Sequence, residues 1–176
     1  GEWQEKEEML RICDTAKEML GFSTAATQGA QPWCVEYQEP KNSITLEVKF
    51  NSDIEYDDAI LALEDFDISE IEFNGRHVEK NALGYYVDFS ITKVNVGKIN
   101  KGENTIVIKK PFNVISCVEN MFLLGNFGVK VLGDTVKIVD AEDKIYFGDW
   151  TTPCLPLDGG TVTYHCKEKG SVNAQL

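Results

Sequence analysis

Acidic side chains are the most numerous groups in this sequence that could do chemistry. The 176 residues include 29 Asp and Glu against 17 Lys and Arg, which gives a formal net charge of −12. Adjacent carboxylates occur at Asp57-Asp58 and Glu64-Asp65, and two carboxyl groups about 5 to 9 Å apart can act as the acid and base of a glycosidase. On so acidic a surface that separation arises by chance, so we interpret most of these acids as solvated groups.

Sulfur and imidazole groups are too scattered to predict a catalytic or zinc site. The two histidines, His77 and His165, are far apart, and the sequence contains no C-x-x-C, G-x-S-x-G or phosphate-binding glycine motif. The five cysteines are Cys13, Cys34, Cys117, Cys154 and Cys166. An odd number without metal-ligand spacing predicts free thiols, several of them buried, in a reducing compartment.

One acidic cluster could serve a structural metal ion. Asp53, Glu55, Asp57 and Asp58 lie near one predicted turn, and hard oxygen ligands of this kind suit calcium. The spacing is not that of an EF-hand, and the sequence predicts no other cofactor.

Composition excludes two classes of partner. A strongly acidic surface repels phosphate backbones, which argues against nucleic acid. No window approaches the roughly 20 apolar residues of a membrane span, so no membrane partner is predicted. Neutral ligands remain compatible with the charge.

The elements that would position a site change in character near residue 40. The first twenty residues predict an amphipathic helix, with Met9, Cys13 and Ala16 on one face and Gly21 as its C-cap. An irregular segment follows to residue 40. We therefore divide the chain into residues 1–40, a helix with an irregular segment, and residues 41–176, a β domain.

Period-two alternation dominates after residue 41. Predicted strands include Ile44–Phe50, Ala59–Leu63 and Ile71–Phe73, and Asn74-Gly75 is a strong hairpin signal because both positions of a type I′ turn need positive φ. The further predicted strands are Tyr85–Ile91, Val94–Val96, Ile106–Ile108, Val118–Leu124, Val129–Val131, Val136–Val139, Ile145–Phe147 and Val162–Cys166. About ten strands with short turns predict an all-β sandwich with an N-terminal helix.

The order of several short motifs carries a resemblance. A strand ending in Asn74-Gly75 and a valine, Val78, is followed by an aromatic strand with Asp88 and then by Gly102-Glu103-Asn104. This order resembles the sugar-binding domain of glycoside hydrolase family 2, a jelly-roll sandwich of the galactose-binding-like superfamily. The stretches at 119–129, 148–151 and 160–164 are similar to long bacterial glycoside-hydrolase-like proteins, so the resemblance covers roughly residues 44 to 165.

The resemblance implies a module that is not an enzyme by itself. Its catalytic acids would lie on another domain of a longer polypeptide. The chain departs from the family pattern at one point. Such relatives have an aromatic residue near a "PFY" sequence after the tryptophan, whereas this chain has Pro156-Leu157-Asp158 there. Asp88 matches the family's strand aspartate, and we expect it to make a structural hydrogen bond to a nearby loop.

A sugar site needs an aromatic face and polar side chains for the hydroxyls. On that basis we predict Trp150, Asp149, Trp33 and Arg76 as ligand-binding residues, with core or interface packing as the alternative for each tryptophan. Tyr85 and Tyr86 are adjacent in a strand and should face opposite ways, one of them into the core.

The functional prediction is a non-catalytic carbohydrate-binding or accessory module of a glycoside hydrolase. Its partners would be carbohydrate and other domains of the same polypeptide. The alternative is a purely structural domain that scaffolds a catalytic domain without binding sugar, and an independent hydrolase ranks last. Free cysteines favour the cytoplasm slightly, whereas polysaccharide-handling proteins are often exported, so localisation stays open.

Overall fold

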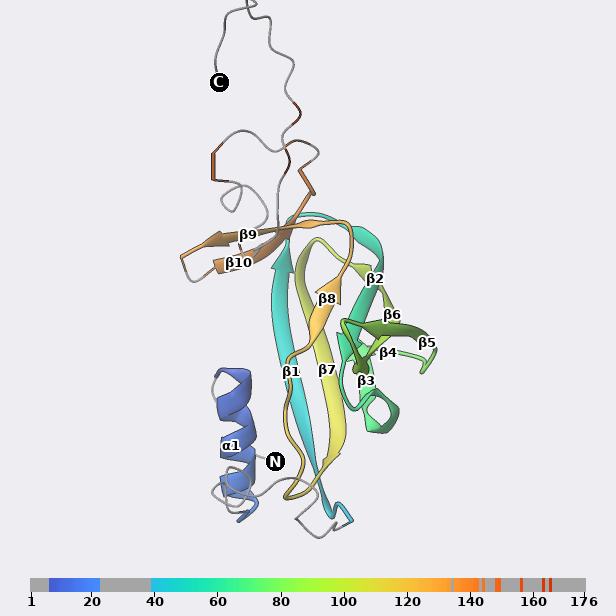
Figure 1. Ribbon diagram of the computed structural model, residues 1–176, viewed down its shortest axis with the longest axis vertical. Coiled ribbons are helices and arrows are strands. Elements are labelled where there is room, and N and C mark those ends of the chain that lie inside the picture. Colours follow the sequence, from blue (N-terminus) through green and yellow to red (C-terminus); the bar gives the residue numbers. More distant parts are fainter. Residues whose placement is uncertain are drawn as a thin grey trace, which may run out of the picture.

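The computed structural model describes residues 7–22, 39–133, 135–142, 144, 148–149, 156, 163 and 165. Within these residues the chain forms one α-helix and ten β-strands (Figure 1). Their bounds are α1 Met9–Met19, β1 Asn42–Ser52, β2 Tyr56–Leu63, β3 Glu70–Phe73, β4 Arg76–His77, β5 Ala82–Tyr86, β6 Asp88–Ile99, β7 Gly102–Phe112, β8 Phe122–Leu124, β9 Gly128–Leu132 and β10 Thr135–Val139; a 3₁₀ turn spans Phe66–Ile68.

The strands form two sheets. A six-stranded sheet has the order β4-β3-β7-β1-β10-β9, and a four-stranded sheet has the order β5-β6-β2-β8. The longest pairing is antiparallel, between β1 and β7, from Asn42 opposite Phe112 to Ser52 opposite Gly102. The short contact of β1 with β10 is parallel.

One hydrophobic core lies between the two sheets. Ile106 and Ile108 of β7 in the first sheet are buried in the same cluster as Leu61 of β2 and Val94 of β6 in the second. Burial along β7 alternates, as the period-two pattern predicts. The predicted all-β class is confirmed at this level: two sheets packed on one core form a β-sandwich with a single helix among the described residues.

Helix α1 packs on the sandwich instead of standing apart from it. Cys13 is buried in the common core, and Ile12, Ala16 and Leu20 pack partly buried against it. Gly21 ends the helix with φ +72°, where the sequence predicts its C-cap. Within the described part of the chain, no helix has the length and apolar character that a membrane span requires.

The motif asparagines hold turns together. Asn74 and Gly75 both have positive φ (50° and 73°), which confirms the predicted hairpin. The buried Asn104 side chain accepts hydrogen bonds from Asn100 N (2.8 Å) and Asn74 Nδ2 (2.8 Å), and donates to the carbonyls of Asn100 and Gly102. Asn74 Oδ1 in turn accepts from Thr105 N at 2.9 Å. The residues that carry the resemblance are therefore structural in this chain.

Three strand predictions need correction. The predicted strand 85–91 is broken, because the chain bends at Val87 (φ 62°), and the strand expected at 94–96 is part of the continuous β6. The predicted strand 118–124 is reduced to β8, residues 122–124. The strand predicted at 145–147 lies outside the described residues, as do Val162, Tyr164 and Cys166 of the strand predicted at 162–166; Thr163 and His165 are described and are not in a strand.

Candidate functional site

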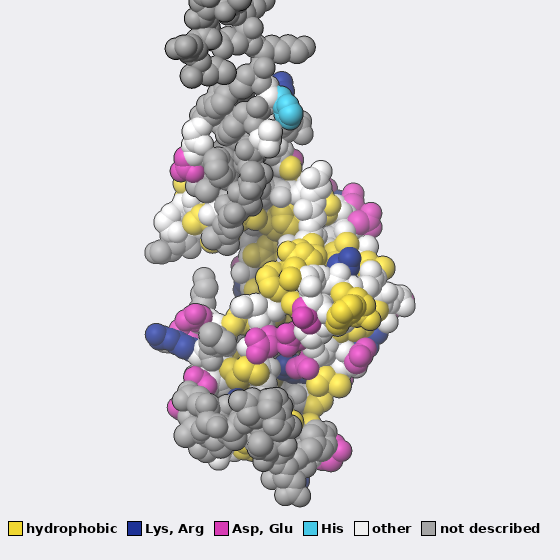
Figure 2. All heavy atoms as spheres, viewed as in Figure 1, with side chains coloured by type: hydrophobic (Ala, Val, Ile, Leu, Met, Phe, Trp, Pro, Cys, Tyr) yellow, Lys and Arg dark blue, Asp and Glu magenta, His cyan; other side chains and the backbone are white. Residues whose placement is uncertain are grey.

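The two most exposed large apolar side chains among the described residues, Val87 and Phe89, lie where β5 meets β6. We call Leu83, Tyr85, Val87 and Phe89 the hairpin patch; their exposed fractions are 50%, 57%, 92% and 82%. Because an aromatic side chain has about 200 Å² of surface, these fractions leave on the order of 400 Å² of apolar surface in water. Patches of that size on a soluble domain are often functional. Figure 2 shows hydrophobic side chains gathered over β5, β6 and β8.

The aromatic rings of this region form two pairs. Tyr85 and Phe89 pack edge to face, with ring centroids 4.9 Å apart and an interplanar angle of 77°. Tyr86 packs on Phe122 of β8, with ring centroids 5.2 Å apart. Tyr85 is thus exposed, as predicted for one of the two tyrosines. Tyr86 would then be the tyrosine expected in the core, but it is half-buried against β8 and does not belong to the central core.

Two carboxylates meet at Ser90, the residue after Phe89 in β6. Asp88 Oδ1 accepts hydrogen bonds from Ser90 N (2.8 Å) and Ser90 Oγ (2.9 Å), and the same hydroxyl lies 3.3 Å from Glu64 Oε1. The two hydrogen bonds from Ser90 lower the pKa of Asp88. Asp88 therefore makes a structural hydrogen bond, but within its own segment and not to the separate loop that the sequence suggested.

The backbone at the tip of the patch is strained. Val87 has φ 62°, while the other non-glycine residues with positive φ are Asp58, Asp65 and Asn74, whose side chains tolerate this region. A β-branched residue there costs about 1–3 kcal/mol. Such strain concentrates at functional sites, so the conformation of Val87 supports a role for the patch.

A small cavity lies on the other side of Glu64. It is lined by residues that include Leu63, Ser69, Lys110 and Val118, and its volume is about 20 Å³. A cavity of this size holds roughly one water molecule. A ligand the size of a sugar ring would therefore bind at an open surface such as the hairpin patch and not in this cavity.

Of the predicted ligand-binding residues, the structure describes Arg76 and Asp149, and neither is one of the four residues of the hairpin patch. Arg76 is exposed in β4, the end strand of the six-stranded sheet. Asp149 is exposed and follows β10 in the chain. Trp150 and Trp33 lie outside the described residues, so their placement stays a prediction.

Two of the four acids in the cluster proposed for calcium form ion pairs with lysines. Asp53 Oδ1 lies 3.3 Å from Lys137 Nζ, and Glu55 Oε2 lies 2.6 Å from Lys98 Nζ. The described residues contain no group of three or more His, Cys, Asp or Glu arranged to hold a metal ion.

Comparison of the chain with protein-family models, with curated proteins and with solved structures finds no match in any of the three. Arguments about function therefore rest on the chain's own residues.

Sequence reasoning missed the hairpin patch for an identifiable reason. Leu83, Tyr85, Val87 and Phe89 recur at every second position, which is also the pattern of a half-buried strand. Whether that face meets a core or water depends on the partner sheet. The one local signal was Gly84, a glycine within an apolar run, which often marks an irregular strand.

Proposed function

We propose that this chain is a non-catalytic carbohydrate-binding or accessory β-sandwich module of a glycoside hydrolase, of the galactose-binding-like jelly-roll type, and that the hairpin patch is its binding surface. The observation that carries the proposal is the exposed, edge-to-face Tyr85–Phe89 ring pair. The motif order around Asn74-Gly75 and Gly102-Glu103-Asn104 supports the type of module.

A sugar needs two kinds of contact, and the chain offers groups for both: the rings of Tyr85 and Phe89, and the oxygens of Asp88, Ser90 and Glu64. Aromatic rings accept the C–H face of a pyranose, and carboxylate or hydroxyl oxygens accept hydrogen bonds from its hydroxyl groups. A neutral sugar also escapes repulsion by the net charge of −12. An open site of this size implies modest affinity, because little of the ligand is buried.

The electrostatics beside the rings favour binding over hydrolysis. A glycosidase needs one carboxylic acid whose pKa is raised, so that it can protonate the leaving oxygen. The hydrogen bonds from Ser90 shift the pKa of Asp88 in the opposite direction. Asp88 is therefore a poor general acid, and the resemblance to glycoside hydrolase modules implies catalytic acids on another domain of the same polypeptide.

A glycan array tests the proposal. The purified chain should bind a defined set of glycans, and Tyr85→Ala/Phe89→Ala should weaken that binding at least tenfold, since each stacking ring contributes about 1 kcal/mol or more. Leu132→Ala/Val136→Ala is the matched control, because it removes two exposed apolar side chains from the β9–β10 hairpin.

Two further measurements on the same array test the remaining predictions. Trp150→Ala tests whether the predicted ligand residue contributes to glycan binding, and measurements with added calcium and with a chelator test whether binding requires calcium.

Circular dichroism must show every variant folded. No binding by the folded wild-type chain, or equal loss in the control variant, would contradict sugar recognition by the patch.

The second candidate is a structural module that docks on a catalytic domain. Val87 and Leu83 favour it, because exposed aliphatic side chains suit protein interfaces better than sugar hydroxyls. In that case the array is silent, and hydrogen exchange of residues 82–92 is slower in the longer polypeptide than in the chain alone. Equal exchange in the two would contradict docking.

A further inference from the structure

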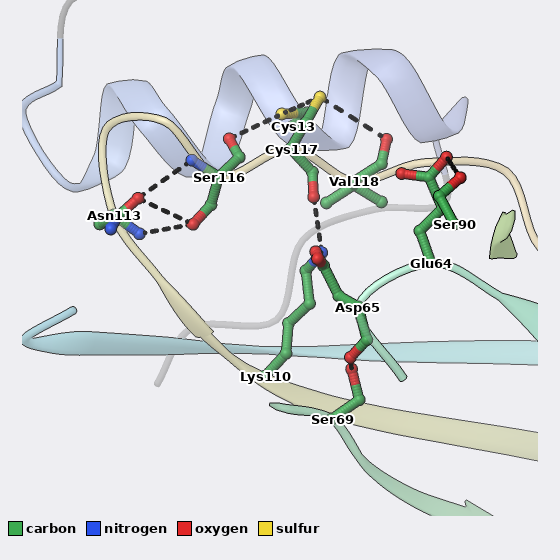
Figure 3. Close-up of polar contacts among 10 residues, drawn as sticks. All are labelled: Cys13, Glu64, Asp65, Ser69, Ser90, Lys110, Asn113, Ser116, Cys117 and Val118. Carbon is green, nitrogen blue, oxygen red and sulfur yellow. Dashed lines mark hydrogen bonds and ion pairs between the residues drawn. The ribbon is translucent and has the colours of Figure 1, made fainter. Parts of the chain in front are cut away.

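Two cysteines that are distant in sequence meet where α1 packs on the sandwich. Cys13 Sγ and Cys117 Sγ lie 3.2 Å apart, although 104 positions separate the two residues (Figure 3). Cys13 is buried in the middle of α1, and Cys117 is partly buried in the segment between β7 and β8. The sulfurs need to approach by only about 1 Å to reach the length of a disulfide bond.

Both sides of this contact are held in place. Lys110 Nζ donates a hydrogen bond to the carbonyl oxygen of Cys117 at 2.6 Å. Ser116 is tied to Asn113 Oδ1 through its backbone N–H (3.1 Å) and its hydroxyl (3.0 Å). Cys13 Sγ also lies within weak hydrogen-bonding distance of the Ser116 carbonyl (3.9 Å). These contacts and the packing of α1 hold the two sulfurs facing each other. Forming a disulfide bond would therefore cost little further conformational entropy.

Other uses of two thiols fit the surroundings less well. Structural zinc requires four ligands, and the described residues hold no group of three or more metal-ligating side chains. A catalytic cysteine needs a stabilised thiolate, but burial, the thiol of Cys13 and nearby Glu119 raise the pKa of Cys117 to about 12. A covalent bond between the two sulfurs is the chemistry that their geometry favours.

We propose that Cys13 and Cys117 form a reversible disulfide that fastens α1 to the sandwich. The oxidant is a low-molecular-weight disulfide. Cys117, the less buried of the two, loses its proton and attacks the small disulfide, slowly near neutral pH because its pKa is raised. This attack forms a mixed disulfide and releases one thiolate; Cys13 then attacks the Cys117 sulfur and releases the second. Two electrons pass from the cysteine pair to the small disulfide, and the two protons of the cysteines end on the two thiols released.

Helix α1 is suited to this kind of control. It has 11 residues, and its N-cap Glu8 makes no capping hydrogen bond through its side chain. Helices this short are marginal in water, so α1 depends on its packing against the core. Figure 1 shows α1 and β5 on opposite sides of the molecule.

The test uses the full chain in a glutathione redox buffer, followed by peptide mapping without reduction. The expected result is a Cys13–Cys117 linked peptide, with a Tm higher than that of the reduced chain by on the order of 10 °C, because the bond closes a loop of about 100 residues. The variant Cys34→Ala/Cys154→Ala/Cys166→Ala keeps only this pair and should show the same link and the same Tm shift.

Adding Cys13→Ala to that triple variant is the matched control. It should lose both the intramolecular link and the redox dependence of Tm, and the single change Cys117→Ala, at a less buried position, should do the same. If the wild-type chain instead links other cysteines, or if the triple variant keeps two titratable thiols in oxidising buffer while folded, the proposal is wrong.

Discussion

At the scale of single residues, the environment of each side chain decides its role. Asn104 and Cys117 illustrate this. Both residue types occur at catalytic and binding sites in other proteins. Here the side chain of Asn104 is buried and makes four hydrogen bonds, and the thiol of Cys117 faces another thiol. The residue types and their positions in the sequence do not by themselves distinguish a structural role from a catalytic or binding role.

Replacing Asn104 tests its structural role. Asn104→Ala should lower the free energy of unfolding by about 2–4 kcal/mol, because it leaves buried backbone groups of the Asn100–Gly102 turn and the Asn74 amide without partners. Urea denaturation measures the change. Asn81→Ala is the control: its side chain is exposed and contacts only Glu79, so its effect should stay within about 0.5 kcal/mol. Similar losses in both variants would contradict the assigned role.

The thiol of Cys117 should be slow to react near neutral pH. Its pKa is raised from 9.0 to about 12, first by burial and then by the Cys13 thiol. A raised pKa means less thiolate at a given pH, so alkylation at pH 8 should be about 10³-fold slower than in the unfolded chain. The rate should rise about tenfold for each pH unit.

Iodoacetamide labelling read by peptide mass spectrometry from pH 7 to 10 measures this rate. Cys13→Ala removes the thiol that helps to raise the pKa, so it should accelerate the labelling of Cys117. Equal rates in the native and unfolded chains would show that the pKa is ordinary.

At the scale of elements, a single residue divides one predicted strand into two. Residues 85–91 have the alternation and aromatic content of a strand, and nothing in their types predicts a left-handed valine. The bend at Val87 lets β5 fold back on β6, with Tyr86 opposite Asp88. Tertiary pairing overrides the local preference here, and the hairpin patch is the consequence.

Relieving this strain should stabilise the protein. Asn tolerates positive φ better than Val does, so Val87→Asn should raise the free energy of unfolding by about 1 kcal/mol. Val136→Asn is the control: it is an exposed valine in an extended strand, and the same change there should be neutral or slightly destabilising. Thermal denaturation of both variants measures the difference. A destabilised Val87→Asn would mean that the valine side chain contributes more through packing than the backbone loses.

At the scale of the whole molecule, two sheets and one helix share a single core. The helix joins that core through Cys13 and its neighbours, while the hairpin patch lies on the opposite side. The molecule thus presents two separate features: an apolar surface available to a ligand or partner, and an internal thiol pair that fastens an otherwise marginal helix. The glycan array measures ligand binding and the redox experiment measures disulfide formation, so the two proposals can fail separately.

Much of the fold follows from the sequence alone. Period-two alternation predicts β1 and β7, and a continuous apolar run predicts β2. The Asn74-Gly75 pair predicts its hairpin, and Gly21 marks the end of α1, because these signals depend on local sterics and side-chain direction. What the sequence did not reveal are long-range pairings: which face of residues 83–89 meets water, how Asn104 reaches Asn74, and that Cys13 meets Cys117. Each depends on segments distant in the chain, so only the packed tertiary structure decides it.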